Sequence, residues 1–549
     1  MPANFSLKRT QDARRFARWD TLPEAQFTQI GTTRDAARTL QSAMAGEIVL
    51  KGDPGYDAAR QIFNPLFNQY PGAIIYCKTE ADVALALQFG QIVPQGFCLR
   101  SGGHSTAGYS TGNGVLIDLS ALDQIAVDAA AMQATVGVGC TFGQLYQALE
   151  HQGLHVPAGE CPDVRVGGFV QGGGYGFTSV SYGLNCDNAL AFRVMLADGS
   201  IVQADSAQNA DLYWALRGGT GGNFGAVLSV TYRLRKLTDV TGFALAWALD
   251  SASGVDQAVA AMLALQSGIL TGTAGWPMNL QVSLCFQNHL DPSRPPPPVG
   301  TPLKPYFMVR GMWLGDPAML PALLAPLIAL PGCINQWQAT DTFRVMNDKL
   351  LNYPQGMPVL DQMPFEDKAC RYIARALTQA EWTALFALFA QAPNNMAYGY
   401  GEFYGGAINQ VAPLDTAFVH RDVAINMVMD VYWLLNKDRA ACETFLQDWL
   451  RCLEPLSNGH VYQNYPNAAD LDYTHRFWGA AYPVLQAVKA KYDPANAFAF
   501  PMQVWAPAGV GGRAGGTPPP LPAGLPAGVG AALAQPVTVL VPPRGGARS

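Results

Sequence analysis

The sequence contains few charged residues, and neither sign dominates. Lysine and arginine number 35 and aspartate and glutamate 41, so the formal net charge is −6 and charged residues make up 14% of the chain. Proteins that bind nucleic acids carry a basic excess on at least one face, because they must neutralise phosphates. The composition therefore predicts no nucleic-acid partner.

Cysteine and histidine are also sparse. There are 10 cysteines, none in a CxxC pair, and 7 histidines. Disulfide frameworks and structural zinc sites need such residues at short, regular spacings. No such spacing is present among His151, His155, His289, His460 and His475. We therefore predict no disulfide scaffold and no metal site.

The chain lacks a long apolar run. Residues 1–20 are polar, and no apolar segment of signal-peptide length follows them. The longest apolar run, 318–333, is interrupted by Pro321, Pro326 and Pro331, and it is shorter than the roughly 18 residues that a membrane span needs. We expect no membrane association and a cytoplasmic location, although export is left open.

Glycine, in contrast, is abundant, with 56 residues. One glycine motif, Arg100-Ser101-Gly102-Gly103-His104-Ser105, follows the apolar run 97–99, which we expect to be a strand. Two glycines let the backbone turn sharply, and successive N–H groups in such a turn form a concave anion site. Arg100 can add a charge-assisted contact, and His104 is placed to meet the bound group. The alternative is a tight turn that carries a surface histidine.

Two further glycine motifs follow. In the first, Cys161 precedes a run that contains Gly167, Gly168, Gly172, Gly173, Gly174 and Gly176, with Tyr175 inside it. Such a run permits close approach to a flat ring, where a Cβ would clash. The last motif, 217–225, places Asn223 among further glycines. A flexible loop alone would not explain why a cysteine stands directly before the glycine run.

Together these motifs resemble the FAD-linked oxidases of the vanillyl-alcohol-oxidase type, in the branch of berberine bridge enzyme and glucooligosaccharide oxidases. The resemblance covers residues 50–235 and 455–505, and the segment between them matches loosely. It implies FAD that is attached twice, through His104 to the 8α-methyl carbon and through Cys161 to carbon 6. It also implies that Val164, three residues after Cys161, favours reaction with oxygen. The implied cofactor contacts are Arg100, Ser101, Gly102, Gly103, His104, Ser105, Cys161, Val164, Gly167, Gly168, Gly172, Gly173, Gly174, Gly176, Asn223 and Asn464.

The resemblance also implies where the catalytic base lies. Residues 462–465 resemble the family's Tyr-x-Asn-Tyr motif, which faces flavin N5, and Tyr175 stands where bacterial members have an active-site tyrosine. A phenol has an ordinary pKa of about 10, so as a base it needs a stabilised anion. We predict Tyr465 as the base, assisted by Tyr175, with Tyr462 as the next candidate; each could instead be a core aromatic. Plant relatives use a glutamate, but Glu402, the comparable residue here, is expected to be an exposed carboxylate.

The predicted fold class is α+β, with a two-subdomain FAD-binding domain and an inserted substrate domain. The insert should be an antiparallel sheet whose one face is covered by helices. We expect FAD-binding segments over 46–237 and 456–505, the substrate-binding domain over 238–455, and an N-terminal extension over 1–45. Residues 506–549 are rich in proline, glycine and alanine, so we expect a disordered, dispensable tail.

Three local signals predict individual helices. Thr79, with Asp82 in place of the usual glutamate, should open a helix through a capping box, and Thr141 should cap the helix that follows it. The N-terminal extension should contain one helix, near 33–45. A single helix is expected over 473–491.

The resemblance implies an FAD-dependent oxidase that takes hydride from an alcohol or hemiacetal carbon to flavin N5 and reduces O2 to H2O2. The substrate should be bulky, either an oligosaccharide or a secondary metabolite. One alternative is a flavin-dependent oxidative cyclase of a natural product. Another is a non-catalytic flavin- or sugar-binding protein, against which the retained tyrosines, His104 and Cys161 argue. We expect a monomer or a homodimer.

Overall fold

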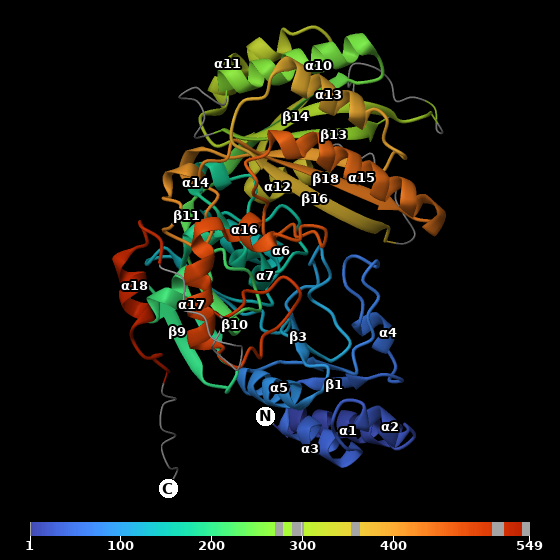
Figure 1. Cartoon of the computed structure of the whole chain (residues 1–549), viewed down its shortest axis with the longest axis vertical. Helices are drawn as coiled ribbons and strands as arrows, with labels where there is room; N and C mark the ends of the chain where they lie inside the picture. Colours follow the sequence, from blue (N-terminus) through green and yellow to red (C-terminus); the bar gives the residue numbers. More distant parts are fainter. Residues whose placement is uncertain are drawn as a thin grey trace.

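The computed structural model describes residues 2–269, 278–287, 298, 301–352, 363–507 and 521–540. Two sheets and their helices form one half of the molecule, and a large sheet with its own helices forms the other half (Figure 1). The chain starts in the first half, crosses to the large sheet near residue 239, and returns to the first half after residue 453.

The first sheet contains four short strands in the order β1-β2-β4-β3. Its strands are β1 (Glu47–Leu50), β2 (Ala73–Tyr76), β3 (Phe97–Arg100) and β4 (Val115–Asp118). β1 runs antiparallel to β2, whereas β2, β4 and β3 run parallel. Helix α5 (Glu80–Ile92) makes the crossover to β3 and begins with the predicted capping box, in which Thr79 and Asp82 each accept a backbone N–H of the other. β3 confirms the strand that was predicted directly before the His104 turn.

The second sheet is antiparallel, with the order β5-β6-β10-β8-β9. Its strands are β5 (Ile125–Asp128), β6 (Gln133–Gly137), β8 (Ala189–Met195), β9 (Ile201–Asp205) and β10 (Ala226–Arg233). Around it lie α6 (Phe142–Glu150), α7 (Val166–Gln171), α8 (Ser179–Tyr182) and α9 (Ala210–Ala215), and β7 (Leu154–His155) pairs with β11 (Arg235–Lys236). Thr141 caps α6, as predicted. The two sheets share one hydrophobic core and correspond to the two expected subdomains.

The large sheet has seven antiparallel strands in the order β15-β12-β14-β13-β17-β18-β16. They are β12 (Asp239–Ala248), β13 (Met278–Gln287), β14 (Lys304–Trp313), β15 (Ile334–Thr342), β16 (Phe365–Ile373), β17 (Tyr398–Phe403) and β18 (Ile425–Trp433). The helices α10 (Ala252–Ala264), α11 (Leu320–Ile328), α13 (Gln379–Phe389) and α15 (Arg439–Leu453) lie on its outer side (Figure 1). The predicted α+β class, with an inserted sheet covered by helices, is confirmed.

The two faces of this sheet differ in polarity because successive strand residues point to opposite sides. On β18, Met427, Met429 and Val431 pack with the outer helices, whereas Asn426 and Asp430 alternate with them and belong to the other face. Polar residues on the paired strands continue this inner face, among them Gln281, Lys368 and Glu402. Helices α12 (Phe343–Asn352) and α14 (Gly406–Gln410) belong to this half and pack against helices of the first half. α12 contacts α6, and α14 contacts α8.

The returning segment contains two helices where a single one was expected. They are α16 (Tyr473–Trp478) and α17 (Tyr482–Tyr492). Gly479 has φ of 43°, in the left-handed region, so the α-helix cannot continue through it. Lys489 of α17 is buried and donates to the carbonyls of Asn223 and Phe498, each at 2.7 Å. The bond to Asn223 joins the returning segment to the first part of the chain.

The N-terminal extension contains three helices, so the prediction of one is wrong. They are α1 (Pro2–Trp19), α2 (Glu24–Thr28) and α3 (Arg34–Ala43), of which α3, capped by Thr33, is the predicted one. Tertiary contacts explain α1, since its last residue, Trp19, is buried and donates to the Asp53 carboxylate at 3.1 Å. No helix in the part of the chain that the structure describes is both long and apolar enough to cross a bilayer.

The C-terminal tail is not disordered over 521–540, so this prediction is wrong there. Helix α18 (Ala527–Leu533) lies beside α9 and α17 and buries Val529 (Figure 1). The Leu540 N–H donates to the Ile201 carbonyl at 2.7 Å, at the free edge of β9. Backbone hydrogen bonds of this kind do not depend on composition, which is why the sequence did not show them. The remaining tail positions, 508–520 and 541–549, lie outside the described residues.

Candidate active site

The inner face of the large sheet meets the loops that carry the second glycine motif. Glu160, the residue before Cys161, accepts hydrogen bonds from the Gln281 amide on β13 and, through its carbonyl, from Asn347 on α12 at 2.7 Å. The Tyr175 hydroxyl donates to the Phe403 carbonyl at the end of β17, at 2.9 Å. These contacts place both ends of the second motif against the inserted domain.

The two predicted attachment residues lie near the same charged groups. The imidazole of His104 stacks on Phe63 with ring centroids 4.7 Å apart. Burial lowers the pKa of His104, so the ring is neutral at pH 7. The pKa values of His104 and Cys161 are affected by the same three charges. These are the carboxylates of Asp163 and Glu366 and the ammonium of Lys368. The structure therefore brings the histidine and the cysteine of two separate motifs into one region.

Cys161 differs from the other cysteines. All ten lie in described parts of the chain, and Cys161 alone is exposed. Desolvation and the neighbouring Glu160 carboxylate nevertheless raise the pKa of its thiol to about 11. Protein therefore surrounds most of this side chain, while part of its surface stays accessible. The thiol is therefore reachable by a bound group but is protonated at neutral pH.

The rest of the first motif has a structural role. Arg100 is buried and its Nε lies 2.5 Å from the Asp118 carboxylate, its register partner on β4. The guanidinium thereby joins two strands, and the predicted anion contact of Arg100 stays a prediction. Ser101 Oγ donates to the Val138 carbonyl at 2.5 Å, and Ser105 Oγ accepts the Tyr109 N–H at 3.0 Å. Gly103, with φ of 79°, does require glycine in the turn.

The glycine run after Cys161 is packed against protein. A Cβ on Gly172 would lie 2.1 Å from the Asn464 amide oxygen, and one on Gly176 would lie 1.9 Å from the Ala158 carbonyl. An added Cβ would also clash at three other glycines. It would meet the Phe418 ring at Gly173 and the Phe169 ring at Gly174. At Gly167 it would meet Ser101 and Val138. These glycines are required by their close protein neighbours, and the predicted approach of a flat ring to the run stays a prediction. Gly168 is different, since a Cβ there would meet nothing within 4 Å, and this glycine borders open space.

Two other predicted contacts also serve the framework. The Asn223 amide is fully buried, donates to the Gly219 carbonyl at 2.9 Å and accepts the Val504 N–H at 2.7 Å. Both ends of this amide are used by the protein, and the predicted cofactor contact of Asn223 stays a prediction. Val164 closes the turn after the cysteine by donating its N–H to the Cys161 carbonyl at 3.3 Å.

Tyr465 and Glu402 form the central pair of the site. The Tyr465 hydroxyl donates to Glu402 Oε1 at 2.8 Å, and Asn426 donates to Glu402 Oε2, also at 2.8 Å. Glu402 is only 2% exposed, so the prediction of an exposed carboxylate is wrong. Its place on the inner face of β17 explains the burial. Desolvation raises the pKa of Glu402 to about 8, in spite of the two hydrogen bonds.

The other two tyrosines have different partners. Tyr175 donates to a backbone carbonyl, as noted above, and its ring stacks on Tyr404 at 5.4 Å. The Tyr462 hydroxyl oxygen accepts from the N–H groups of Gly174 and Tyr175, at 2.9 and 3.1 Å, and from the Asn464 amide at 3.0 Å. Tyr462 thus fixes the glycine run, while its ring lies edge-on to Tyr465 at 4.8 Å. Glu402, rather than Tyr175, accepts the hydrogen bond of Tyr465.

Sequence reasoning missed a set of polar residues on β16 and β18. Lys368 and Asp430 are register partners on these strands, and Glu366 and Asn426 lie on the same face. The available signal was polar residues at even spacing within otherwise apolar strands, 366 and 368 in one and 426 and 430 in the other. Without the pairing of the strands, this signal did not show which residues would meet.

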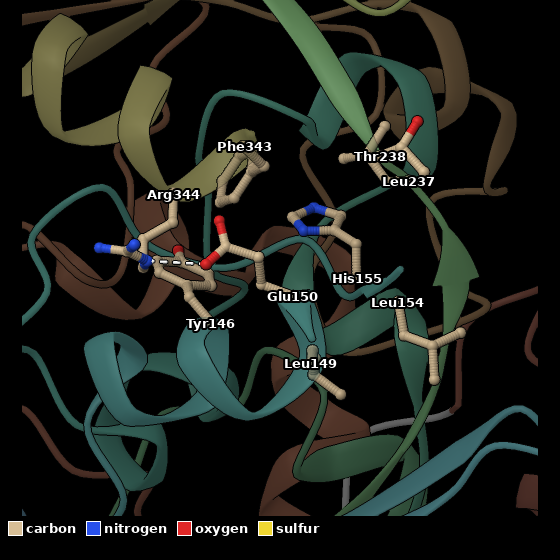
Figure 2. A pocket seen from close by; sticks show the side chains of 9 residues that line it. All are labelled: Tyr146, Leu149, Glu150, Leu154, His155, Leu237, Thr238, Phe343 and Arg344. Atoms are coloured by element: carbon tan, nitrogen blue, oxygen red, sulfur yellow. Dashed lines mark hydrogen bonds and ion pairs between the residues drawn. The ribbon is translucent and has the colours of Figure 1, made fainter. Parts of the chain in front are cut away.

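A small cavity between α6 and α12 lies apart from this site (Figure 2). It has room for about one water molecule, about 20 Å³. Arg344 donates to Glu150 at 2.9 Å on one side, and buried His155, whose pKa burial lowers to about 3, lies on the other. None of the predicted site residues lines it. In addition, no group of three or more histidine, cysteine, aspartate or glutamate residues in the described ranges is arranged to hold a metal ion, and His289 falls outside those ranges.

Comparison with known proteins agrees with this arrangement. The FAD binding domain family matches residues 71–205, which include His104 and Cys161, and the family described as berberine and berberine like matches residues 461–504, which include Tyr465. The FAD-linked oxidoreductase YgaK of Bacillus subtilis (strain 168) is 26% identical over 84% of this chain and 98% of its own length. Glucooligosaccharide oxidase of Sarocladium strictum is 27% identical over 81% of this chain and 89% of its own.

Solved structures give the same result. The structure of BBE-like 1 from Physcomitrella patens superposes with a TM-score of 0.74 at 26% sequence identity, over 85% of this chain and 98% of that chain. The glycine motifs, the two-sheet FAD-binding domain and the inserted seven-stranded sheet are thus accounted for together. The chain is an FAD-linked oxidoreductase, and its family matches and its fold are similar to those of the berberine-bridge-enzyme-like branch of the vanillyl-alcohol-oxidase type.

Proposed function

We propose that the protein is an oxidase that removes a hydride and a proton from a CH–OH carbon of a bulky hydroxylated substrate. The hydrogen bond from Tyr465 to buried Glu402 is the observation that carries this proposal. Bound FAD supplies the hydride acceptor, and O2 returns the cofactor to its oxidised form with release of H2O2. The protein has to orient the hydroxyl and accept its proton.

The geometry indicates how the proton moves. Burial and the neighbouring Glu402 raise the pKa of Tyr465 far above its ordinary value, so a free phenolate is costly here. The cost is avoided if the phenol oxygen takes the substrate proton while its own proton passes to Glu402 Oε1. The product is then neutral glutamic acid beside an intact phenol. Because the pKa of Glu402 is about 8, the pair is ready to accept a proton once the carboxyl is ionised.

Asn426 and Tyr462 keep this pair in place. Asn426 orients the carboxylate by donating to the oxygen that Tyr465 does not use. Tyr462, fixed by three donors, supports the Tyr465 ring edge-on. The Tyr175 hydroxyl already donates to the Phe403 carbonyl, so we do not assign Tyr175 as the main hydrogen-bond partner of Tyr465. We assign it instead a packing role against the Tyr404 ring.

We further propose that FAD is attached through both His104 and Cys161. A neutral imidazole and an accessible thiol are two nucleophiles. Because the same charged groups shift the pKa of both, the two side chains lie in one region of the molecule. Attachment by a thiol requires the thiolate. Since the pKa of Cys161 is about 11, this bond should form faster at alkaline pH than at neutral pH.

The polar inner face of the large sheet supports a hydroxyl-rich substrate. Gln281 and Glu402 from adjacent strands lie on this face, next to the base. Glucooligosaccharide oxidase, to judge from its name, oxidises oligosaccharides, and its similarity over most of its length supports the same class here. A polyphenolic secondary metabolite and oxidative cyclisation are the alternatives. A binding protein would have no use for the buried Tyr465–Glu402 pair.

A screen for H2O2 release over oligosaccharides and polyphenolic alcohols tests this function. We expect turnover that yields a ketone or lactone and is abolished in Tyr465→Phe and Glu402→Gln. A new ring in the product, with no new carbonyl group, would favour the cyclase. If no substrate reduces the flavin while sugars still shift its absorbance, the protein is a binding protein.

A further inference from the structure

Glu160, the residue directly before Cys161, is held by side chains of the inserted sheet. Its Oε1 accepts a hydrogen bond from the Gln281 amide on β13, and its Oε2 lies 3.9 Å from Arg310 Nη2 on β14. Gln281 and Arg310 are register partners, and Arg310 donates to Gln281 Oε1 at 2.8 Å. We call these three linked side chains the Glu160 bridge. It joins the turn of the second motif to the inserted domain.

The Glu160 bridge is largely removed from solvent. Gln281 and Arg310 are buried, and 16% of the Glu160 side chain is exposed. A buried guanidinium is costly unless an opposite charge lies close to it. Glu160 supplies such a charge to Arg310. The carboxylate beside Cys161 is therefore part of the packing between the two halves and is not a solvated surface group.

The backbone on both sides of Cys161 is fixed as well. Asn347 on α12 donates to the Glu160 carbonyl at 2.7 Å, and the Tyr146 hydroxyl on α6 donates to the Gly159 carbonyl. After the cysteine, the Val164 N–H donates to the Cys161 carbonyl at 3.3 Å. Cys161 is thus an accessible side chain on a backbone that both halves of the molecule hold. Bond formation at one particular carbon atom is favoured by such a fixed nucleophile.

Glu160 acts on the Cys161 thiol in two ways that have opposite signs. Its carboxylate helps to raise the pKa of the thiol, and because only the thiolate attacks carbon, this charge slows attachment. Its hydrogen bonds, in contrast, fix the position of the thiol. The other charges that act on Cys161 are the ammonium of Lys368 and the carboxylates of Glu366 and Asp163. Charge alone therefore gives no reason for a glutamate at this position.

We propose that Glu160 is a positioning residue that holds the Cys161 thiol for attachment to FAD, with Gln281 and Arg310 of the inserted domain as its anchors. This inference rests on the proposed attachment through Cys161. In that reaction an Sγ–C6 bond replaces the S–H bond of Cys161 and the C6–H bond of the flavin. The two protons and two electrons that are released pass to O2, which becomes H2O2.

The histidyl bond does not depend on the Glu160 bridge. The turn that carries His104 is held within the FAD-binding half, where the Phe63 N–H donates to the Gly103 carbonyl at 3.1 Å. The Phe63 ring also stacks on His104. Changes in the Glu160 bridge should therefore affect the cysteinyl bond and leave the histidyl bond intact.

The test measures the cysteinyl bond alone, in a His104→Ala background. Purified protein is incubated with FAD at pH 7, and the flavin that stays with the acid-denatured chain is followed over time. Gln281→Leu removes one anchor and changes no charge, so attachment should slow by about tenfold. Glu160→Leu should also slow it, although the loss of the carboxylate favours the thiolate. Glu160→Gln, which keeps an acceptor for Gln281, should attach flavin faster than Glu160→Leu.

Two controls separate positioning from a general loss of structure. Gln338→Leu makes the same change at an exposed position of β15 in the same sheet, and it should leave the rate unchanged. In a Cys161→Ala background, where only the histidyl bond can form, Gln281→Leu and Glu160→Leu should leave the attached flavin unchanged. Equal slowing in both backgrounds would mean a structural role and would overturn the proposal.

The remaining outcomes distinguish this inference from the attachment on which it rests. If His104→Ala alone releases all of its flavin, attachment through Cys161 fails. If His104→Ala retains flavin and neither Gln281→Leu nor Glu160→Leu slows its attachment, only the role of Glu160 is overturned. Faster attachment in Glu160→Leu would show that charge outweighs position and would overturn that role too. Should Glu160→Leu not fold, Gln281→Leu decides, because an unchanged rate contradicts the proposal.

Discussion

Tyr465 donates a hydrogen bond of 2.8 Å to Glu402 Oε1, although the two residues are 63 positions apart in the chain. Glu402 comes from the inserted sheet, and Tyr465 from the segment that returns to the FAD-binding domain. The proposed base is therefore assembled only when the two halves of the molecule are packed together. Each half contributes one of the two groups of this hydrogen bond.

The first prediction concerns the phenol. Tyr465→Phe removes the proton acceptor and little volume, so the rate of flavin reduction should fall by about 10²–10⁴-fold, or about 3–5 kcal/mol of barrier. Rapid-mixing measurement of flavin bleaching under anaerobic conditions gives this rate. Tyr175→Phe is the matched control, and it should cost less than tenfold because its hydroxyl bonds a backbone carbonyl. The assignment would be reversed if Tyr175→Phe were slow and Tyr465→Phe were normal.

The second prediction concerns pH. Because the pKa of Glu402 is raised to about 8, flavin reduction should increase as the pH rises through about 8, and Glu402→Gln should abolish this limb. The same shift affects stability. A carboxyl whose pKa is raised on folding stabilises the fold while it is protonated, and this contribution is lost as the pH rises from the ordinary value near 4.5 to about 8.

Denaturant unfolding at a series of pH values measures the second effect. The contribution of Glu402 should fall by at most about 1.4 kcal/mol per pH unit in that window. Glu402→Gln should therefore lose less stability than the wild type between pH 5 and pH 8. An identical pH dependence in both proteins would show that the Glu402 carboxyl is already ionised in the folded state at pH 5.

The sequence predicted the parts of this molecule that local chemistry specifies. The turn at Gly103 and the capping box at Thr79 are encoded within short segments, and the structure has both where they were predicted. His104 and Cys161, predicted from equally short motifs, lie in one region of the structure. The burial of Glu402 was missed because it depends on the register of β17 against β18. The protein contacts of the glycine run were missed for the same kind of reason. Whether Gly172 borders a ligand or Asn464 is decided by a distant part of the chain, the segment that returns from the inserted sheet.

The third prediction concerns the flavin linkage. After denaturation in acid, a yellow fluorescent band should stay with the protein on a gel. His104→Ala and Cys161→Ala should each retain part of the flavin, because the other bond remains, and the double variant should release all of it. Cys98→Ala, a change at a cysteine that is not exposed, is a control that should leave the linkage intact. Release of flavin from the wild-type protein would contradict both attachments.

The last prediction reverses what composition suggested about the tail. Asn209 donates to the Thr538 carbonyl at 2.9 Å and accepts the Thr538 N–H at 3.0 Å, and Lys491 donates to the Ala532 carbonyl at 2.7 Å. Each such bond contributes about 0.5–1.5 kcal/mol net, and the entropy of ordering the segment offsets part of the sum. Truncation after Trp505 should therefore lower the Tm by about 2–5 °C at fixed FAD content.

Val529→Asp in the full chain should have a similar effect, since Val529 is the buried residue of α18. Gly528→Ala is its matched control, because a Cβ there meets nothing within 4 Å. If truncation and Val529→Asp both leave the Tm unchanged, the docked tail contributes nothing to stability.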